Sequence, residues 1–210
     1  MRIIADDRFK RGLLVGLLTR AQQASKHFIQ QPELLRAMAL IALRTAEEVN
    51  QKSASEDGGR EIEIAQMQLR TSLLMSPSDS FLWLMLYSIN ISQNGLSSSD
   101  VAYLDQSYTT GPYEGWIALR RNREVLAAFP FLPGVLQKRV ISEFSAMVDS
   151  DFIDDAALNV MTVGWAFRER LAAGLEQVDL ISRERLAKRL ATDRVKLRIP
   201  GVEIDDRPWR

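Results

Sequence analysis

Residues 69–84 of the chain read LRTSLLMSPSDSFLWL, and residues 104–119, which lie 35 positions later, follow the same pattern as LDQSYTTGPYEGWIAL. In each copy a helix-forming segment ends at a small residue and a proline, Pro77 or Pro112. An acidic residue, Asp79 or Glu114, then precedes an aromatic one. Proline stops one helix and pre-sets the backbone of the next, and an acidic residue favours a helix start. The stretch predicts one helix–turn–helix unit used twice, which is typical of stacked helical hairpins.

The rest of the chain continues this helical pattern. Apolar residues recur at helical spacing, and the alternating Val, Ile and Thr runs that are typical of strands are missing. We expect helices at about residues 7–30, 32–51, 60–75, 79–94, 97–110, 112–129, 134–150, 151–177 and 182–195. The predicted organisation is an N-terminal hairpin (1–51), a connector (52–59), a repeat core (60–129), C-terminal helices packed on the repeat stack (130–198) and an irregular tail (199–210).

The repeated unit resembles the tetratricopeptide repeat (TPR). If Pro77 closes a repeat, Ala65 and Ser72 stand where that family has small residues. In the repeat that follows, Trp83 and Leu86 take the places of the first aromatic residue and the leucine. The pattern is not kept at Tyr87, Asn90, Ala118 and Arg121. The resemblance covers about residues 60–112 and is degenerate to residue 129.

This resemblance implies an all-α fold of antiparallel hairpins stacked as a short right-handed superhelix. In the TPR family the inner helices line a groove that receives a peptide or a partner helix. We therefore expect a non-catalytic scaffold that binds a protein or peptide partner, and we expect Trp83, Leu86 and Trp116 to lie in the core. The candidate partner-binding residues are Tyr87, Asn90, Tyr113, Arg120, Arg121 and Asn122. The alternative fold is a generic helical bundle in which the repeat is coincidental.

Composition limits the remaining classes of function. The chain has 27 Lys plus Arg and 27 Asp plus Glu, so no overall charge favours nucleic acid or an anionic membrane. The absence of cysteine excludes disulfides, thiolate zinc sites and a cysteine nucleophile. No apolar run approaches the ~20 residues that span a bilayer. We interpret the apolar residues 12–18 as a buried helix face, or alternatively as a homodimer contact of the N-terminal helix. The expected location is the cytoplasm, with the periplasm or a bacterial envelope complex, which the resemblance implies, as the alternative.

Residues suited to catalysis do not form a recognisable set. The single histidine, His27, lacks the neighbours that a metal site or a general base needs. An acidic cluster lacks the glycine and the ligand spacing of a calcium loop, and its position at a predicted helix start suits the helix dipole; its members are Asp149, Asp151, Asp154 and Asp155. We predict no catalytic residue, no metal site and no cofactor, and we predict that the protein is not an enzyme.

A basic segment near the C-terminus gives a second functional hypothesis. Its candidate residues are Arg183, Arg185, Lys188 and Arg189. Such a patch could contact nucleic acid or the surface of a membrane, and the alternative function is therefore an adaptor that uses this helix. We favour a solvated helix, because the aromatic residues that stack on bases are missing from the segment.

Overall fold

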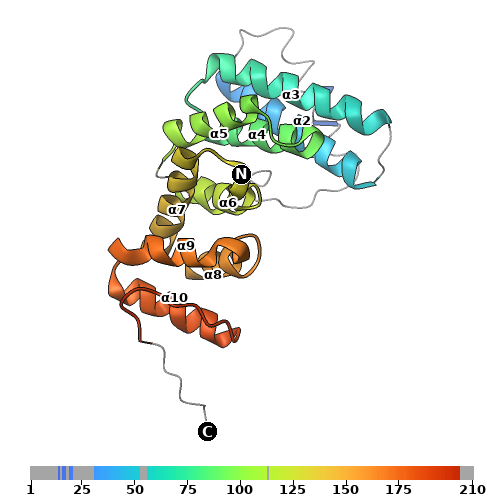
Figure 1. Cartoon of the computed structure of the whole chain (residues 1–210). Coiled ribbons are helices and arrows are strands. Elements are labelled where there is room, and N and C mark those ends of the chain that lie inside the picture. Colours follow the sequence, from blue (N-terminus) through green and yellow to red (C-terminus); the bar gives the residue numbers. More distant parts are fainter. Residues whose placement is uncertain are drawn as a thin grey trace. The chain divides into compact units, whose positions relative to one another are not determined.

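The computed structural model describes residues 31–52, 56–112 and 114–203, together with Leu14, Gly16, Leu17, Thr19 and Arg20 (Figure 1). All regular structure in these residues is helical, and none of them lies in a strand. The predicted all-α class is therefore confirmed. The chain divides into two compact units, residues 1–110 and residues 111–210. The division falls in the second proline turn of the repeated stretch. Most of the predicted helix at residues 7–30 lies outside the described residues, and so does most of the proposed N-terminal dimer contact.

In its described residues, unit 1 (residues 1–110) contains two pairs of packed helices. The first pair is α2 (Pro32–Lys52) with α3 (Glu56–Met75), and the second is α4 (Ser80–Asn94) with α5 (Ser98–Thr110). Helix α3 also packs against α4, which joins the pairs (Figure 1). Ala39, Ala42 and Ala46 of α2 are buried, as is Ala65 of α3. Small side chains let two helices approach closely. Residues 56–59, which were predicted to lie in a connector, belong to α3.

Helix α4 forms the core of unit 1. Its sequence is apolar around most of its circumference, and the fully buried residues include Leu82, Leu84 and Leu86. The helix begins where the Asp79 carboxylate accepts hydrogen bonds from the backbone N–H groups of Phe81 and Leu82, both at 3.1 Å. It ends at Gly95, whose positive φ of 72° favours glycine. The structure confirms Leu86 as a core residue, whereas Trp83 is only half-buried.

The helix ends and helix starts around the two proline turns have the 35-residue spacing of the sequence pattern. Helix α3 ends at Met75 and α5 ends at Thr110, while α4 begins at Ser80 and α6 (Gly115–Leu126) begins at Gly115. Both helix ends and both helix starts are therefore separated by 35 residues. The residues that precede α4 and α6 also have nearly the same dihedral angles. Asp79 has φ −75° and ψ 94°, and Glu114 has φ −84° and ψ 94°.

Unit 2, residues 111–210, is built around α7 (Gly134–Asp149), which packs against α6, α8 (Ile153–Met161), α9 (Arg168–Ala173) and α10 (Leu180–Thr192). Short 3₁₀ helices, η1 (Phe129–Phe131), η2 (Trp165–Phe167) and η3 (Gly174–Gln177), link these elements. The buried face of α7 follows helical spacing, and its residues are Leu136, Val140, Glu143, Phe144, Met147 and Val148. The expectation that Trp116 lies in the core is wrong, because 44% of it is exposed.

The predicted single helix at residues 151–177 is wrong. It is replaced by α8, a turn, η2, α9 and η3. The break centres on Gly164, whose backbone N–H donates a hydrogen bond of 2.7 Å to the Asn159 carbonyl. A Cβ atom at Gly164 would lie 2.9 Å from the Asn159 carbonyl oxygen and from Leu171 Cδ1. Only glycine lets the chain double back so closely, and the turn divides the predicted helix.

Helices α7 and α10 end in the same way. The residue two positions after each helix has a positive φ, 65° at Asp151 and 60° at Arg194. After α10, the N–H of Arg194 donates to the carbonyl of Ala191 at 2.9 Å, and that of Val195 donates to Leu190 at 3.0 Å. This is the Schellman pattern of helix termination, in which glycine usually occupies the left-handed position. Two charged residues hold that position here.

Candidate functional site

Four of the six predicted partner-binding residues are buried. At most 8% of each is exposed, and they are Tyr87, Asn90, Arg121 and Asn122. The expectation that they line an exposed groove is therefore wrong. Arg120 is partly exposed, and its Nε donates a hydrogen bond of 2.7 Å to Glu124 Oε1 on the same helix. Tyr113 lies outside the described residues.

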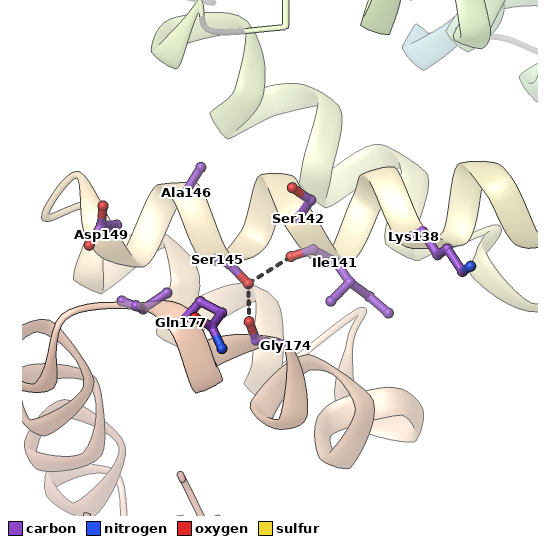
Figure 2. Close-up of a pocket in the computed structure, with 9 residues that line it drawn as sticks. Lys138, Ile141, Ser142, Ser145, Ala146, Asp149, Gly174 and Gln177 are labelled. Atoms are coloured by element: carbon purple, nitrogen blue, oxygen red, sulfur yellow. Dashed lines mark hydrogen bonds between the residues drawn. The ribbon is translucent and has the colours of Figure 1, made fainter. Parts of the chain in front are cut away.

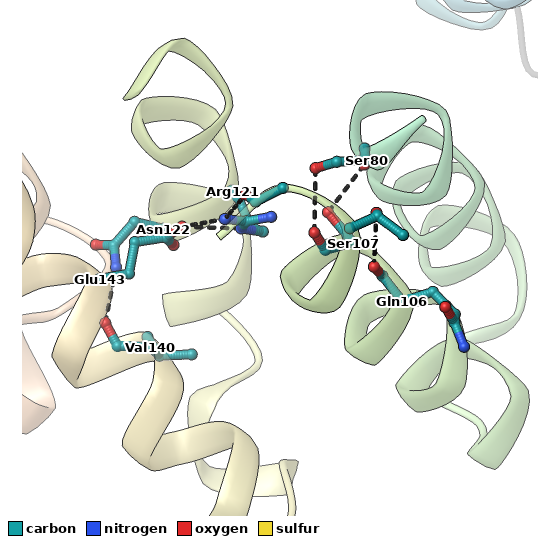
Figure 3. A network of polar contacts seen from close by, with 9 residues as sticks. Ser80, Gln106, Ser107, Arg121, Asn122, Val140 and Glu143 are labelled. Carbon is teal, nitrogen blue, oxygen red and sulfur yellow. Dashed lines mark hydrogen bonds and ion pairs between the residues drawn. The ribbon is translucent and has the colours of Figure 1, made fainter. Parts of the chain in front are cut away.

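Arg121 and Asn122 hold together the interior of unit 2 (Figure 3). Arg121 donates to Glu143 Oε1 from Nε at 2.8 Å and from Nη2 at 2.6 Å, and Nη2 also donates to the Gly111 carbonyl at 3.0 Å. Asn122 Nδ2 donates to the Val140 carbonyl at 3.0 Å. These contacts tie α6 to α7. A buried charge is tolerated when it is paired and hydrogen-bonded, so the arrangement explains why polar side chains occupy the core.

The sequence contained a sign of this network. In the 35-residue register Arg121 of α6 corresponds to Leu86 of α4, a core position. On α7, Glu143 lies beside the buried Phe144 within an otherwise apolar face. A charged residue in a core register on each of two helices indicates a buried ion pair better than it indicates a binding groove.

Asn90 has a comparable role in unit 1. Its Nδ2 donates to Asp100 Oδ1 on α5 at 3.0 Å, and its Oδ1 accepts from Gln66 Nε2 on α3 at 2.8 Å. Helices α4 and α5 are joined further by a reciprocal serine pair (Figure 3). Ser107 Oγ donates to the Ser80 carbonyl at 2.9 Å, and Ser80 Oγ donates to the Ser107 carbonyl at 3.1 Å. The polar residues of these helices therefore fix how the pair packs.

The predicted basic patch and the predicted acidic cluster meet in unit 2. Arg185 Nη1 lies 2.8 Å from Asp151 Oδ1, and Arg189 Nε lies 2.5 Å from Asp154 Oδ1. Hydrogen bonds to Asp154 and then to Asp193 raise the pKa of the Arg189 guanidinium above its ordinary value. Two of the four candidate charges on α10 are thus compensated by α8 and the residues that precede it.

The other two candidates on α10 differ from each other. Arg183 is partly buried, and its Nη1 donates to the Pro200 carbonyl at 2.5 Å. This bond fastens the segment after α10, in which Leu197 and Ile199 are buried, to the helix. Lys188 is exposed. The structure therefore does not bring the four basic side chains together as one open cationic surface.

Exposed apolar side chains lie on one face of α3 in unit 1, beside an arginine and two aromatic residues. Leu74 is 83% exposed and Met67 is 56% exposed, and their seven-residue spacing puts them on one face of the helix. Arg70, between them in sequence, holds its guanidinium carbon 5.5 Å from the ring centroid of Tyr103 on α5. The Tyr103 ring stacks on Trp83 of α4 with centroids 5.9 Å apart. We call these five residues the α3 surface.

A groove runs along α7 in unit 2, with a cavity volume of about 410 Å³ (Figure 2). Helix α7 supplies Lys138, Ile141, Ser142, Ser145, Ala146 and Asp149, and the chain from η3 onwards supplies Gly174, Gln177 and Val178. Ser145 Oγ donates to the Gly174 carbonyl at 2.9 Å, which fastens η3 to α7. A Cβ atom at Gly174 would lie only 2.4 Å from Ile141 Cγ2, so this wall needs glycine.

Neither surface holds recognisable catalytic chemistry. Within the parts of the chain that the structure describes, no three His, Cys, Asp or Glu side chains converge as metal ligands would. No described helix has the length and apolarity needed to cross a bilayer. His27 lies outside the described residues. No family model, no curated protein and no solved structure matches the chain.

Proposed function

We propose that the protein is a non-catalytic scaffold of TPR-like helical hairpins that binds a protein partner through the α3 surface. The proposed repeat identity is supported by the 35-residue register of the helix ends and by the matching backbone at Asp79 and Glu114. The observation that carries the proposed function is the exposure of Leu74, 83%, beside an ordered stack of arginine and aromatic rings.

The composition of the α3 surface suits a protein interface. Interface centres are enriched in Met, Arg, Tyr and Trp, and a few such side chains provide most of the binding free energy. Leu74 and Met67 supply apolar area that would be removed from water on binding. Arg70, Tyr103 and Trp83 supply the residue types that most often anchor a partner.

The α3 surface is also ordered before any partner arrives. Trp83 Nε1 donates to the Pro77 carbonyl at 2.8 Å, which fixes the indole against the turn between α3 and α4. Tyr103 stacks on that indole, and Arg70 lies against Tyr103. Side chains already held in place lose less conformational entropy on binding, so this stack favours affinity.

The proposed surface differs from the groove that the resemblance implied. In TPR proteins the opening helix of each pair lines the groove, and here the corresponding candidates on α4 and α6 are largely buried. The α3 surface instead combines the closing helices α3 and α5 with Trp83 at the start of α4. We propose that partner recognition in this chain uses the closing helices.

Site-specific photocrosslinking in cells of the source organism tests this proposal. A photoreactive phenylalanine analogue replaces Leu74 in the full chain, and the same analogue at Ile181 of α10, which is 59% exposed, is the matched control. We expect a discrete protein adduct from position 74 that is absent from position 181. Adding Met67→Asp or Arg70→Ala should remove the adduct. Identical adducts from both positions, or none from position 74, would contradict the proposed function.

The adaptor hypothesis for α10 is the less favoured function. The ion pairs of Arg185 with Asp151 and of Arg189 with Asp154 reduce the charge available to phosphates. We expect no salt-dependent binding of the full chain to duplex DNA, single-stranded RNA or anionic vesicles. Binding at low salt that Lys188→Glu weakens would favour the adaptor instead.

A further inference from the structure

The α7 groove has opposite charges at its two ends. Lys138 lies near the start of α7 and Asp149 is its last residue, which at 1.5 Å per residue separates them by about 16 Å along the helix. Both side chains are exposed, and among the described residues neither takes part in an ion pair. This contrasts with Asp151 and Asp154 nearby, which are paired with arginines of α10. The groove therefore carries one uncompensated cation and one uncompensated anion.

The spacing of the groove residues on α7 is symmetric. From Lys138 to Asp149 the steps between lining residues are 3, 1, 3, 1 and 3, and they read the same from the other end. If a second α7 lies antiparallel on the first, Lys138 meets the partner's Asp149 and Asp149 meets the partner's Lys138. Between the charged ends the exposed residues of this face are Ser142 and Ala146, while Ile141 and Ser145 lie against Gly174 of their own chain. The two charged ends of α7 thus have complementary counterparts in a second copy.

We propose that the protein forms a homodimer in which the α7 grooves of two copies face each other, antiparallel, about a two-fold axis. A two-fold interface uses the same patch on both subunits, so the patch must be complementary to itself. The Lys138 and Asp149 ends satisfy that requirement only in the antiparallel orientation, because a parallel pair would bring like charges together. The charges select the orientation, while the accessible apolar atoms of α7, chiefly those of Ile141 and Ala146, supply the area removed from water.

The structure of the groove suits a rigid interface. The single hydroxyl proton of Ser145 is shared between the carbonyl oxygens of Gly174 and Ile141, which lie 2.9 and 3.0 Å from Oγ, and this contact fastens the floor of the groove (Figure 2). Asp149 Oδ1 accepts from the Asp179 N–H at 3.4 Å, which places the anionic end of the groove beside the start of α10. The dimer surface lies in unit 2, whereas the α3 surface lies in unit 1, so the two proposals are independent.

Charge reversal tests the dimer and its orientation together. Sedimentation velocity of the full chain, from micromolar to millimolar concentrations, should show a reversible monomer–dimer equilibrium. Lys138→Asp makes both ends acidic and Asp149→Lys makes both ends basic, and each should weaken self-association about tenfold or more. An equimolar mixture of the two variants should recover a dimer, because each reversed end then meets its opposite charge.

Control variants test whether a change in self-association comes from misfolding or from the α3 surface. Lys188→Asp changes another exposed lysine, outside the groove, and should leave the dimer unchanged. Leu74→Asp should also leave it unchanged, so failure of the α3 proposal cannot be mistaken for failure of the dimer. Recovery in the mixture shows that both reversed chains are folded. A wild-type chain that stays monomeric, reversals that leave the dimer intact, or reversed chains that do not associate with each other would overturn the proposal.

Discussion

Arg121 and Glu143 form an ion pair inside unit 2, with N–O distances of 2.8 and 2.6 Å and side-chain exposures of 0% and 5%. Arg121 of α6 lies 35 positions after Leu86, a buried residue of α4. A buried pair offers little net stabilisation over apolar residues, but loss of one partner leaves an uncompensated charge. The two positions therefore share burial in a helix but differ in the chemistry of their side chains.

We expect Glu143→Leu to lower the free energy of unfolding by about 3–5 kcal/mol, and Arg121→Leu to have a similar effect. The double variant should lose less than either single variant, because no buried charge is left without its counter-ion. Urea denaturation followed by circular dichroism measures the three losses. Additive losses would show that the pair is not coupled as the structure implies.

The serines at the equivalent positions of α3 and α5 should differ in their contributions to stability. Ser107 and Ser80 exchange two hydrogen bonds, and we expect Ser107→Ala to cost about 1–2 kcal/mol. Ser72 lies 35 positions earlier, and among the described residues its buried Oγ has no hydrogen-bond partner. Because alanine removes an unsatisfied polar atom, Ser72→Ala should be neutral or stabilising. Equal losses for the two variants in the same denaturation assay would contradict this explanation.

A shorter acidic side chain at position 114 should stabilise the start of α6. Glu114 has the same backbone conformation as Asp79 but makes no capping hydrogen bond through its side chain. Aspartate is a much better N-cap residue, so Glu114→Asp should raise the free energy of unfolding by about 0.5–1 kcal/mol. Glu114→Ala, the control, should change it little. The thermal midpoint measures both effects, and an equal shift in the two variants would exclude capping as the cause.

Replacement of Arg194 by glycine should not lower the free energy of unfolding. Its φ of 60° lies in the left-handed region, which costs an L-residue about 1–2 kcal/mol relative to ordinary helical backbone. We expect Arg194→Gly to stabilise the fold by up to about 1 kcal/mol, because glycine adopts that conformation freely. The matched control is Arg198→Gly, at an exposed position without a positive φ, which should be slightly destabilising. Destabilisation by Arg194→Gly in the urea assay would contradict the prediction.

Sequence reasoning predicted the helical class and the turns at Pro77 and Pro112 because proline and helix caps act locally. It failed at the break after α8, since the 3₁₀ turns around Gly164 keep a nearly helical spacing of apolar residues. It also failed at Arg121, whose partner Glu143 is 22 positions away on another helix. The resemblance assigned Arg121 to a groove because the distant helix that pairs with it could not be identified from the sequence.

Trp83, which stacks on Tyr103, can serve as an intrinsic fluorescence probe of the α3 surface. The indole of Trp83 is half-buried, accepts the Tyr103 ring on one face and belongs to the surface that we assign to a partner. A chain in which Trp116, Trp165 and Trp209 are changed to phenylalanine keeps this indole as its single emitter among the four tryptophans. Its fluorescence maximum and its quenching by acrylamide then report directly whether the α3 surface is open to solvent or covered.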